Sequence, residues 1–374
     1  MCIIALQNLS ISSKFSLSVG SIIIVPGTGS YIPLFIKKNE DFLKANFLNS
    51  DGSKFNLSNE VIVRKFKSIT GIEERRYAND HLNTSDIAFL AAEKAIADAK
   101  INQEKIDYII VAHNFGDIKK GTIQSDMLPS LASRVKFNLG IKNPECVCYD
   151  LIFGCPGWIE GVIQANSFIK SGIAKTCLVI GAETLSRTFD LNDRDSMIYA
   201  DGAGATIIES KENEIGCGIL SHKSCTYTDK EAYYLFFGES YNNESKDSTR
   251  FIKMHGRKVY EFAIVHVPKA LKECLELSNE SINNVKKVFL HQANEKMDEA
   301  IVDRFYKLYN METPKNVLPM SINKLGNSSV ASIPTLLDLV KNFKLKDHSL
   351  KKGDVILFGS VGAGMNINAI TYKV

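Results

Sequence analysis

The sequence predicts an α/β protein assembled from two similar halves. Strand-like apolar runs alternate with helix-like segments through most of the 374 residues, a pattern typical of α/β folds. The order of these segments recurs later in the chain, which indicates a duplicated unit. The composition, 45% hydrophobic and 23% charged, is that of a globular chain that can bury a large core.

The first half is expected over residues 21–210, after an N-terminal tail at residues 1–20. Apolar runs predict its strands at 21–29, 107–113, 146–151, 176–183 and 204–210, and helix-like segments lie at 85–100, 125–138 and 156–171. Residues 34–60 are polar and only weakly periodic. We therefore expect this stretch to be an insertion or a long loop.

The second half is expected over residues 211–374. Its helix candidates are 257–277, 294–309 and 330–343, and its strand candidates are 287–292, 354–361 and 367–374. Residues 222–250 again predict an insertion or long loop. In each half a helix, a polar loop and a strand lead to a histidine, and a glycine corner that opens a helix follows. The duplication would bring these corners together around a pseudo-two-fold axis, where α/β sheets collect ligands.

Cys155 lies at the corner of the first half, in Gly154-Cys155-Pro156. Glycine permits a sharp turn, and proline suits the first helical position because it lacks an N–H. Free N–H groups and the helix dipole favour a thiolate at such a terminus. The corner predicts a nucleophile whose own N–H faces an oxyanion. The alternative is a small buried hydrophobic residue, as most cysteines are.

His291 and Asn327 are the candidates from the second half. His291 follows an apolar strand, where a neutral ring can donate to an enolate or take a proton. The alternative is a core or capping histidine, and His113 is a rival at the equivalent place in the first half. The Asn327 amide can donate to a charged oxygen, or can be an ordinary N-cap. The N–H of Gly364, in a glycine-rich turn, would complete an oxyanion hole with that of Cys155.

Several function classes are disfavoured by composition and motifs. A net charge of +3 excludes a strong polyanion binder, so no nucleic-acid partner is expected. No fingerprint of a nucleotide-binding glycine loop is present. The spacing of Cys146 and Cys148 is too tight for a zinc or redox pair, so the eight cysteines indicate reduced thiols in the cytoplasm and no metal site. No apolar run reaches the ~18 residues of a membrane span, and the start lacks the basic segment of a signal peptide.

Eight motifs then occur in the order found in one known family. They are "TGIEERRYA" (70–78), "FGCPGW" (153–158), "IGAETLSR" (180–187), "DRDSMIYADGAGA" (193–205), "MHGRKVYEFA" (254–263), "HQAN" (291–294), "LGNSSVASIP" (325–334) and "GSVGAG" (359–364). From residue 21 to 374 the chain resembles the ketoacyl synthase III family of condensing enzymes. The resemblance implies a thiolase-like fold with a five-layered α-β-α-β-α core, a homodimer, and no cofactor or metal.

The resemblance also implies a role for each corner residue. Cys155 would take an acyl group as a thioester. His291 and Asn327 would bind the thioester carbonyl of a malonyl-type substrate, stabilise the enolate left by loss of CO₂, and so permit a Claisen condensation. The related branch with two histidines would not place asparagine at 327. The acyl donor would be acyl-CoA or an acyl thioester of acyl carrier protein.

One departure from the family concerns the adenine of coenzyme A, which family members often stack between a tryptophan and an arginine. Arg194 matches the arginine, but Lys65 stands at the tryptophan position, and Trp158 follows the nucleophile instead. The departure favours acyl carrier protein, an acidic partner that a basic rim would bind. Candidate rim residues, each of which can equally be a solvated charge, are Arg187, Arg194, Arg250, Lys253, Arg257 and Lys258.

The remaining candidates concern the acyl group and the type of reaction. Phe153, Trp158 and the residues around Phe115 are expected either to line an acyl pocket or to be plain core. Two other functions stay open: transfer of the acyl group without decarboxylation or synthesis of a resorcinol precursor, and a non-catalytic thioester-binding partner of another synthase. Release of CO₂ from a malonyl thioester would separate the first of these from condensation.

Overall fold

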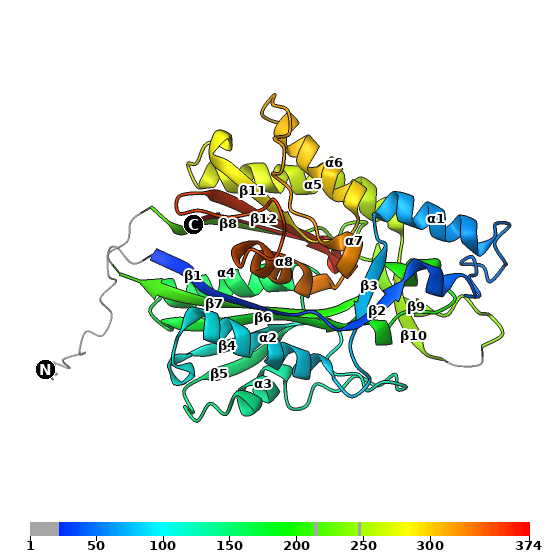
Figure 1. The fold of residues 1–374 in the computed structure, drawn as a ribbon, viewed down its shortest axis with the longest axis horizontal. Helices are drawn as coiled ribbons and strands as arrows, with labels where there is room; N and C mark the ends of the chain where they lie inside the picture. Colours follow the sequence, from blue (N-terminus) through cyan, green and yellow to red (C-terminus); the bar gives the residue numbers. More distant parts are fainter. Residues whose placement is uncertain (1–21, 213–215, 246–247) are drawn as a thin grey trace, which may run out of the picture.

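The protein is described by a computed structural model that covers residues 22–212, 216–245 and 248–374. The tail expected at residues 1–20 lies outside the described residues. Within them, two β-sheets are stacked with helices between them and on both outer faces (Figure 1). The five-layered α-β-α-β-α architecture is therefore confirmed.

The first sheet has the strand order β1-β7-β6-β4-β5. Its strands are β1 (Ile22–Tyr31), β4 (Tyr108–Ala112), β5 (Val147–Leu151), β6 (Thr176–Thr184) and β7 (Asp201–Lys211). The adjacent strands β6, β4 and β5 are parallel, with β5 at the edge of the sheet, while β7 runs antiparallel to both β6 and β1. Every residue of β6 is buried, as expected for a strand covered on both faces.

The second sheet has the order β11-β12-β13-β8 and takes all its strands from residues 218–373. The strands are β8 (Gly218–Thr226), β11 (Val285–Leu290), β12 (Val355–Gly362) and β13 (Asn366–Lys373). Only β11 and β12 pair in parallel. Strand β5 of the first sheet ends shortly before Cys155, and strand β11 of the second sheet ends directly before His291.

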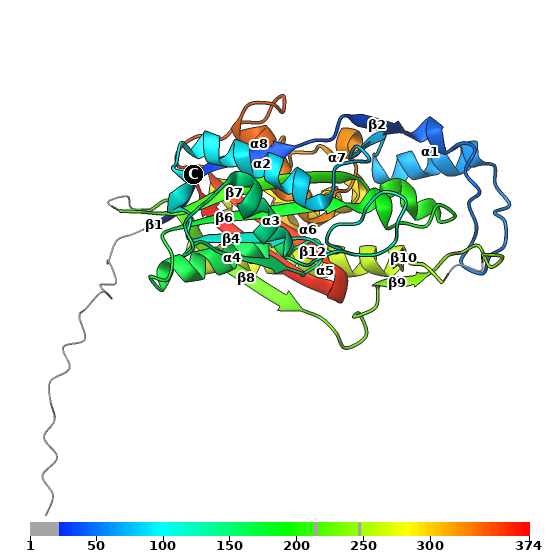
Figure 2. The same cartoon turned by 90° about the horizontal axis from the view of Figure 1, so that it is seen from below.

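Six longer helices form the three helical layers (Figures 1 and 2). The outer layer of the first sheet is α2 (Thr84–Ala99) and α3 (Leu131–Leu139), and the central layer is α4 (Gly157–Lys170) and α8 (Ser332–Lys341). The outer layer of the second sheet is α5 (Gly256–Leu277) and α6 (Glu295–Lys307). The central helices are apolar on most sides because both sheets cover them.

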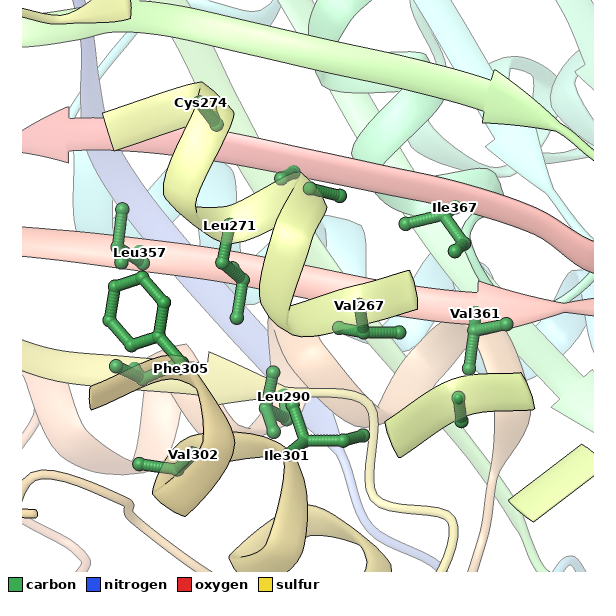
Figure 3. Close-up of a cluster of buried hydrophobic side chains, with 14 of the residues drawn as sticks. Val267, Leu271, Cys274, Leu290, Ile301, Val302, Phe305, Leu357, Val361 and Ile367 are labelled. Atoms are coloured by element: carbon green, nitrogen blue, oxygen red, sulfur yellow. The ribbon is translucent and has the colours of Figure 1, made fainter. Parts of the chain in front are cut away.

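Packing across these layers uses the periodicity of the helices. Figure 3 shows Val267 and Leu271 of α5 in the same cluster as Ile301 and Phe305 of α6, over Leu357 of the second sheet. Each helical pair is four residues apart and so lies on one face of its helix. Burying such large apolar side chains stabilises the fold by about 1.5–3 kcal/mol each.

One end of the molecule carries smaller elements that were not predicted from the sequence. They are β2 (Phe35–Lys38), α1 (Asn59–Thr70), β3 (Glu74–Tyr77), β9 (Leu235–Glu239) and β10 (Arg250–Met254). The expectation of irregular loops at 34–60 and 222–250 is thus wrong in part, because β2, the start of α1, the end of β8 and β9 fall there. Strands of four or five residues on small two-stranded ribbons show too few alternations to be recognised.

The start of α3 was also predicted too early, at residue 125. Pro129 ends the preceding loop, and the Ser130 hydroxyl accepts a hydrogen bond from Ser133 N at 3.2 Å as the N-cap. A proline disfavours helix in the residue before it, so the helix begins only after it, at Leu131.

Candidate active site

A single cavity of about 690 Å³ is lined by all three predicted catalytic residues, Cys155, His291 and Asn327. Cys155 follows β5, His291 follows β11, and Asn327 precedes α8. The two halves of the chain thus bring their corner residues to one place, as the duplication predicted. The cavity opens toward the end of the molecule that carries α1, β9 and β10, which supply apolar side chains to its wall: Ile62, Phe66, Ile69, Leu235, Phe236, Phe237, Ile252 and Met254.

The corner of Cys155 depends on two close backbone approaches. Gly154 has φ +69°, and a Cβ on it would lie 2.9 Å from the Ala363 nitrogen. A Cβ on Gly362 would lie 2.5 Å from the Cys155 nitrogen. Glycine is required at both positions, because the turn after β12 packs directly against the nucleophile corner. The helix α4 begins at Gly157 with Pro156 as its N-cap residue, one position later than predicted.

The surroundings of the Cys155 thiol disfavour its thiolate form. Burial raises the pKa of the Cys155 thiol to about 11, although a hydrogen bond from Ser329 and one from its own N–H oppose the shift. The Ser329 hydroxyl oxygen lies 3.2 Å from the sulfur. The prediction that the helix terminus keeps this thiol ionised is therefore wrong, because the cost of desolvating a thiolate exceeds the stabilisation by the dipole.

His291 is buried and neutral. Burial lowers the pKa of its imidazole to about 4, and the Ser329 backbone opposes this only partly. Its Nδ1 lies 2.8 Å from the Ser332 hydroxyl, whose oxygen also accepts a hydrogen bond from Gln292 N. A hydroxyl that donates to Nδ1 requires the tautomer with the ring proton on Nε2. A neutral ring of this tautomer donates a hydrogen bond from Nε2.

Asn327 is held from both its backbone and its side chain. Its N–H donates to Ile198 O, its carbonyl accepts from Ala200 N, and its Oδ1 accepts from Ser329 N at 2.8 Å. The Oδ1 bond forms a local turn with the residue two positions on. The N-cap residues of the two helices that follow are Ser328 and Ala331, so Asn327 is not the N-cap of the alternative. The amide nitrogen remains as the donor group of this cavity-lining side chain.

The predicted partner in the oxyanion hole is in the wrong place. Gly362 and Ala363 line the cavity, and Gly364 does not. Gly364, at φ +74°, lies in the turn that carries the chain from β12 into β13, away from Cys155. Ala363, whose nitrogen lies beside Gly154, lines the cavity in place of Gly364.

The substrate-binding candidates divide between cavity and core. Arg194 and Arg257 line the cavity together with Lys65, and the Arg194 guanidinium lies 5.1 Å from the centre of the Phe55 ring. Trp158 is only 2% exposed, donates from Nε1 to Thr206 Oγ1 at 3.3 Å, and is core.

Neither Trp158 nor Phe153 lines the cavity, so the structure does not support their assignment to an acyl pocket. Trp158 is buried in α4, and Phe153 is half-buried in the turn before that helix. Phe115 does line it and stacks on Phe237 with ring centroids 5.1 Å apart.

Three other candidates are internal. His113 is fully buried, with Nε2 3.1 Å from Asp150 Oδ2 and Nδ1 accepting from Gly116 N, so the rival histidine stays outside the cavity. Lys253 is buried between Asp190 and Asp193, at 2.7 Å and 3.2 Å.

The Arg187 guanidinium donates to the carbonyl oxygens of Ile118 and Leu82. Neither Lys253 nor Arg187 is free to meet a partner protein, so both are removed from the predicted basic rim.

Ser329, Asn114, Glu183 and Ser332 are polar residues of the site that the sequence analysis did not single out. Ser329 and Ser332 lie within the quoted motif at 325–334 and Glu183 within that at 180–187, but their partners are distant in sequence. Among the described residues, no cluster of three or more His, Cys, Asp or Glu side chains could hold a metal ion. The helices described are all too short or too polar to cross a membrane.

Comparisons with known proteins agree with this geometry. The family model "3-Oxoacyl-[acyl-carrier-protein (ACP)] synthase III" matches residues 149–228, and the model of its C-terminal part matches residues 275–374. The chain is 34% identical to a β-ketoacyl-[acyl-carrier-protein] synthase III of Rickettsia bellii over 340 residues, 91% of this chain and 95% of the relative. It is 33% identical to a synthase of the same name from Vibrio vulnificus, over 90% of this chain and 95% of the relative.

Solved structures show the same fold. The 3-oxoacyl-[acyl-carrier-protein] synthase III of Aquifex aeolicus has a TM-score of 0.75 at 31% identity and covers 95% of this chain and 100% of its own. The priming β-ketosynthase of the R1128 polyketide pathway has a TM-score of 0.77 at 22% identity, over 95% of this chain and 97% of its own. The thiolase-like fold is confirmed, and the chain belongs to the 3-oxoacyl-[acyl carrier protein] synthase III family of condensing enzymes.

Proposed function

We propose that this protein is a β-ketoacyl-[acyl carrier protein] synthase III-like condensing enzyme of fatty acid or related polyketide biosynthesis. The observation that carries the proposal is the set of groups around one cavity: a thiol, a neutral imidazole and a carboxamide donor. This set suits formation of a thioester followed by stabilisation of an enolate. A thiol nucleophile also requires a reducing compartment such as the cytoplasm.

In the first step Cys155 takes the acyl group. The sulfur attacks the carbonyl carbon of the incoming thioester as the thiol gives up its proton, and that proton ends on the departing carrier sulfur. The N–H groups of Cys155 and Ala363 are proposed to bind the tetrahedral oxyanion. The carrier thiolate then leaves and takes up a proton, so that the acyl group stays on Cys155.

In the second step the carbonyl oxygen of a malonyl-type thioester accepts hydrogen bonds from His291 Nε2 and Asn327 Nδ2. The C–C bond to the carboxylate breaks, and CO₂ leaves. The electron pair of that bond forms the enolate, which these donors stabilise. The enolate carbon attacks the acyl carbonyl, and the Cys155 sulfur leaves. Both donors are neutral, so they stabilise negative charge on the thioester carbonyl oxygen as that charge develops.

Acyl carrier protein is the proposed carrier of both substrates. Lys65, Arg194 and Arg257 line the cavity and would face its acidic surface and phosphate. The apolar wall from α1, β9 and β10 is suited to an aliphatic or aromatic acyl group.

Replacing Cys155 with alanine is expected to abolish covalent loading, because no other thiol among the described residues lines the cavity. The measurement is intact-protein mass spectrometry after incubation with an acyl-[acyl carrier protein]. Cys217→Ala, at a half-buried cysteine outside the cavity, is the matched control and should load fully. Undiminished loading of Cys155→Ala would exclude this nucleophile, and absence of CO₂ release by the wild-type protein from malonyl thioester would favour simple acyl transfer.

A homodimer is part of the proposal. Strand β5 lies at the edge of the first sheet, and Val147 and Ile152 at its two ends are 45% and 60% exposed. An apolar edge strand of this kind invites pairing with a second copy. Light scattering should give about twice the 41.5 kDa chain mass, and Val147→Lys should shift the protein to monomer. A monomeric wild-type protein, or equal dissociation by lysine at the exposed Ile173, would contradict this interface.

A further inference from the structure

A line of hydrogen bonds connects a buried carboxyl group to the candidate nucleophile. Glu183, on β6 and 1% exposed, accepts a hydrogen bond from Asn114 Nδ2. The same nitrogen lies 3.1 Å from Ser329 Oγ, and that hydroxyl lies 3.2 Å from the Cys155 sulfur. The four residues come from separate parts of the chain, and three of them, all except Glu183, line the cavity.

The direction of each bond in this line follows from the chemistry of the groups. An amide nitrogen can only donate, so Asn114 gives one hydrogen to Glu183 and the other to the Ser329 oxygen. The Ser329 hydroxyl, with its oxygen accepting from Asn114, directs its own proton to the sulfur. A hydrogen bond donated to sulfur stabilises the thiolate more than the thiol, and so favours ionisation.

The backbone of Ser329 is held in an uncommon conformation. Its φ is +49°, in the left-handed region that residues other than glycine and asparagine seldom adopt. Its N–H is fixed by Asn327 Oδ1 at 2.8 Å. Strain of this kind persists where surrounding contacts determine the conformation, and it often accompanies function.

The protonation state of Glu183 decides whether this line of hydrogen bonds favours or opposes ionisation of the Cys155 thiol. Burial raises the pKa of the Glu183 carboxyl well above its usual range; the bonds from Asn114 oppose the shift, and Asp201 of β7 adds to it. A charged Glu183 would in turn raise the pKa of Cys155. The other titratable groups that face the sulfur are His291, which is neutral, and Tyr199, whose hydroxyl burial keeps protonated.

We propose that Glu183 and Asn114 are positioning residues that aim the Ser329 hydroxyl at the Cys155 sulfur for acyl loading. The inference rests on the proposed function for the nucleophilic role of Cys155. It concerns a property that can be measured without any substrate, namely the reactivity of that thiol.

The test is the rate of Cys155 alkylation by iodoacetamide between pH 7 and 11, measured on the Cys155 peptide by mass spectrometry. Ser329→Ala and Asn114→Leu are each expected to slow alkylation at pH 8 roughly tenfold and to move the profile up by about one pH unit, the size of a hydrogen bond to a charged group. Glu183→Leu should give a similar loss, and Glu183→Gln should restore most of the rate, because the carboxamide oxygen also accepts from Asn114.

Thr184→Val is the matched control. It removes a buried hydrogen bond, to Thr84 at 2.8 Å, from the residue next to Glu183 in β6, whose side chain points to the opposite face. Its alkylation profile should equal that of the wild-type protein. Thermal unfolding curves of all variants show which of them fold. One folded variant, either Ser329→Ala or Asn114→Leu, is sufficient for the test.

Two results would overturn the inference. Unchanged profiles of folded Ser329→Ala or Asn114→Leu would show that the line does not act on the sulfur. Alkylation of Glu183→Gln much faster than wild type would show that Glu183 is charged and opposes ionisation. Failure of the wild-type protein to load an acyl group would instead refute the proposed function and leave the alkylation profiles to be judged by themselves.

Discussion

Replacing Asn327 with aspartate is expected to lower the rate of condensation by about 10²–10³-fold, the cost of losing one donor to a developing oxyanion. The substituted carboxylate accepts hydrogen bonds where the enolate oxygen needs a donor, and it adds a like charge. Acyl loading of Cys155 should continue, because the first step uses the backbone N–H groups of Cys155 and Ala363.

The two half-reactions are measured separately, loading by mass spectrometry and condensation by CO₂ release from labelled malonyl thioester. Asn310→Asp, an exposed position after α6, controls for the change of net charge. Activity of Asn327→Asp should recover in part as the pH falls, since a protonated aspartic acid can donate again. Condensation by Asn327→Asp at the wild-type rate would exclude the carboxamide as an enolate donor.

Replacing Lys253 with methionine is expected to destabilise the protein by about 3–5 kcal/mol. The ammonium group is 1% exposed and contacts Asp190 at 2.7 Å and Asp193 at 3.2 Å, so its loss leaves two buried carboxylates without a cation. It also lies 3.3 Å from the centre of the Tyr241 ring. Asp193, which Lys253 contacts, directly precedes Arg194 of the cavity wall. Loss of the ion pair is therefore also expected to loosen this part of the wall.

Equilibrium unfolding in urea measures this loss, with Lys286→Met on the exposed face of β11 as the control. Although burial opposes it, the bond from Lys253 holds the pKa of Asp190 below its usual value. This contribution to stability is therefore present above the ordinary pKa of aspartate, about 3.9, and is lost as the pH falls through the lowered value. The difference between Lys253→Met and wild type should accordingly be larger at pH 8 than in acid below the lowered pKa of Asp190, and equal stability at pH 8 would contradict the pairing.

The long elements of this fold are predictable because each carries its own signal. Helix α5 shows apolar residues at helical spacing over six turns, and β6 and β12 are apolar runs of strand length. The short ribbons β2–β3 and β9–β10 lack such a signal. Their strands form because they pair with each other at one end of the molecule, which depends on the position of the two sheets.

The residue types at the candidate site were likewise predictable, but their environment was not. A glycine corner marked Cys155, and a strand followed by a helix start marked His291. The burial that raises the pKa of the thiol depends on close packing against Gly362 of the other half. Which residue of that turn lines the cavity depends on its backbone conformation, with positive φ at both Gly364 and Met365.

The sequence by itself determined the two-fold α/β plan, the order of the main strands and helices, and the three side chains that meet in the cavity. Periodicity and turn residues act over a few positions, so a single sequence records them. Only the tertiary structure decided that Trp158 is core and Lys253 is paired internally. It also decided that Ser329, 174 residues from Cys155 along the chain, donates to its sulfur. Desolvation and hydrogen bonding depend on which groups are brought together in space, and neighbours along the chain do not encode that.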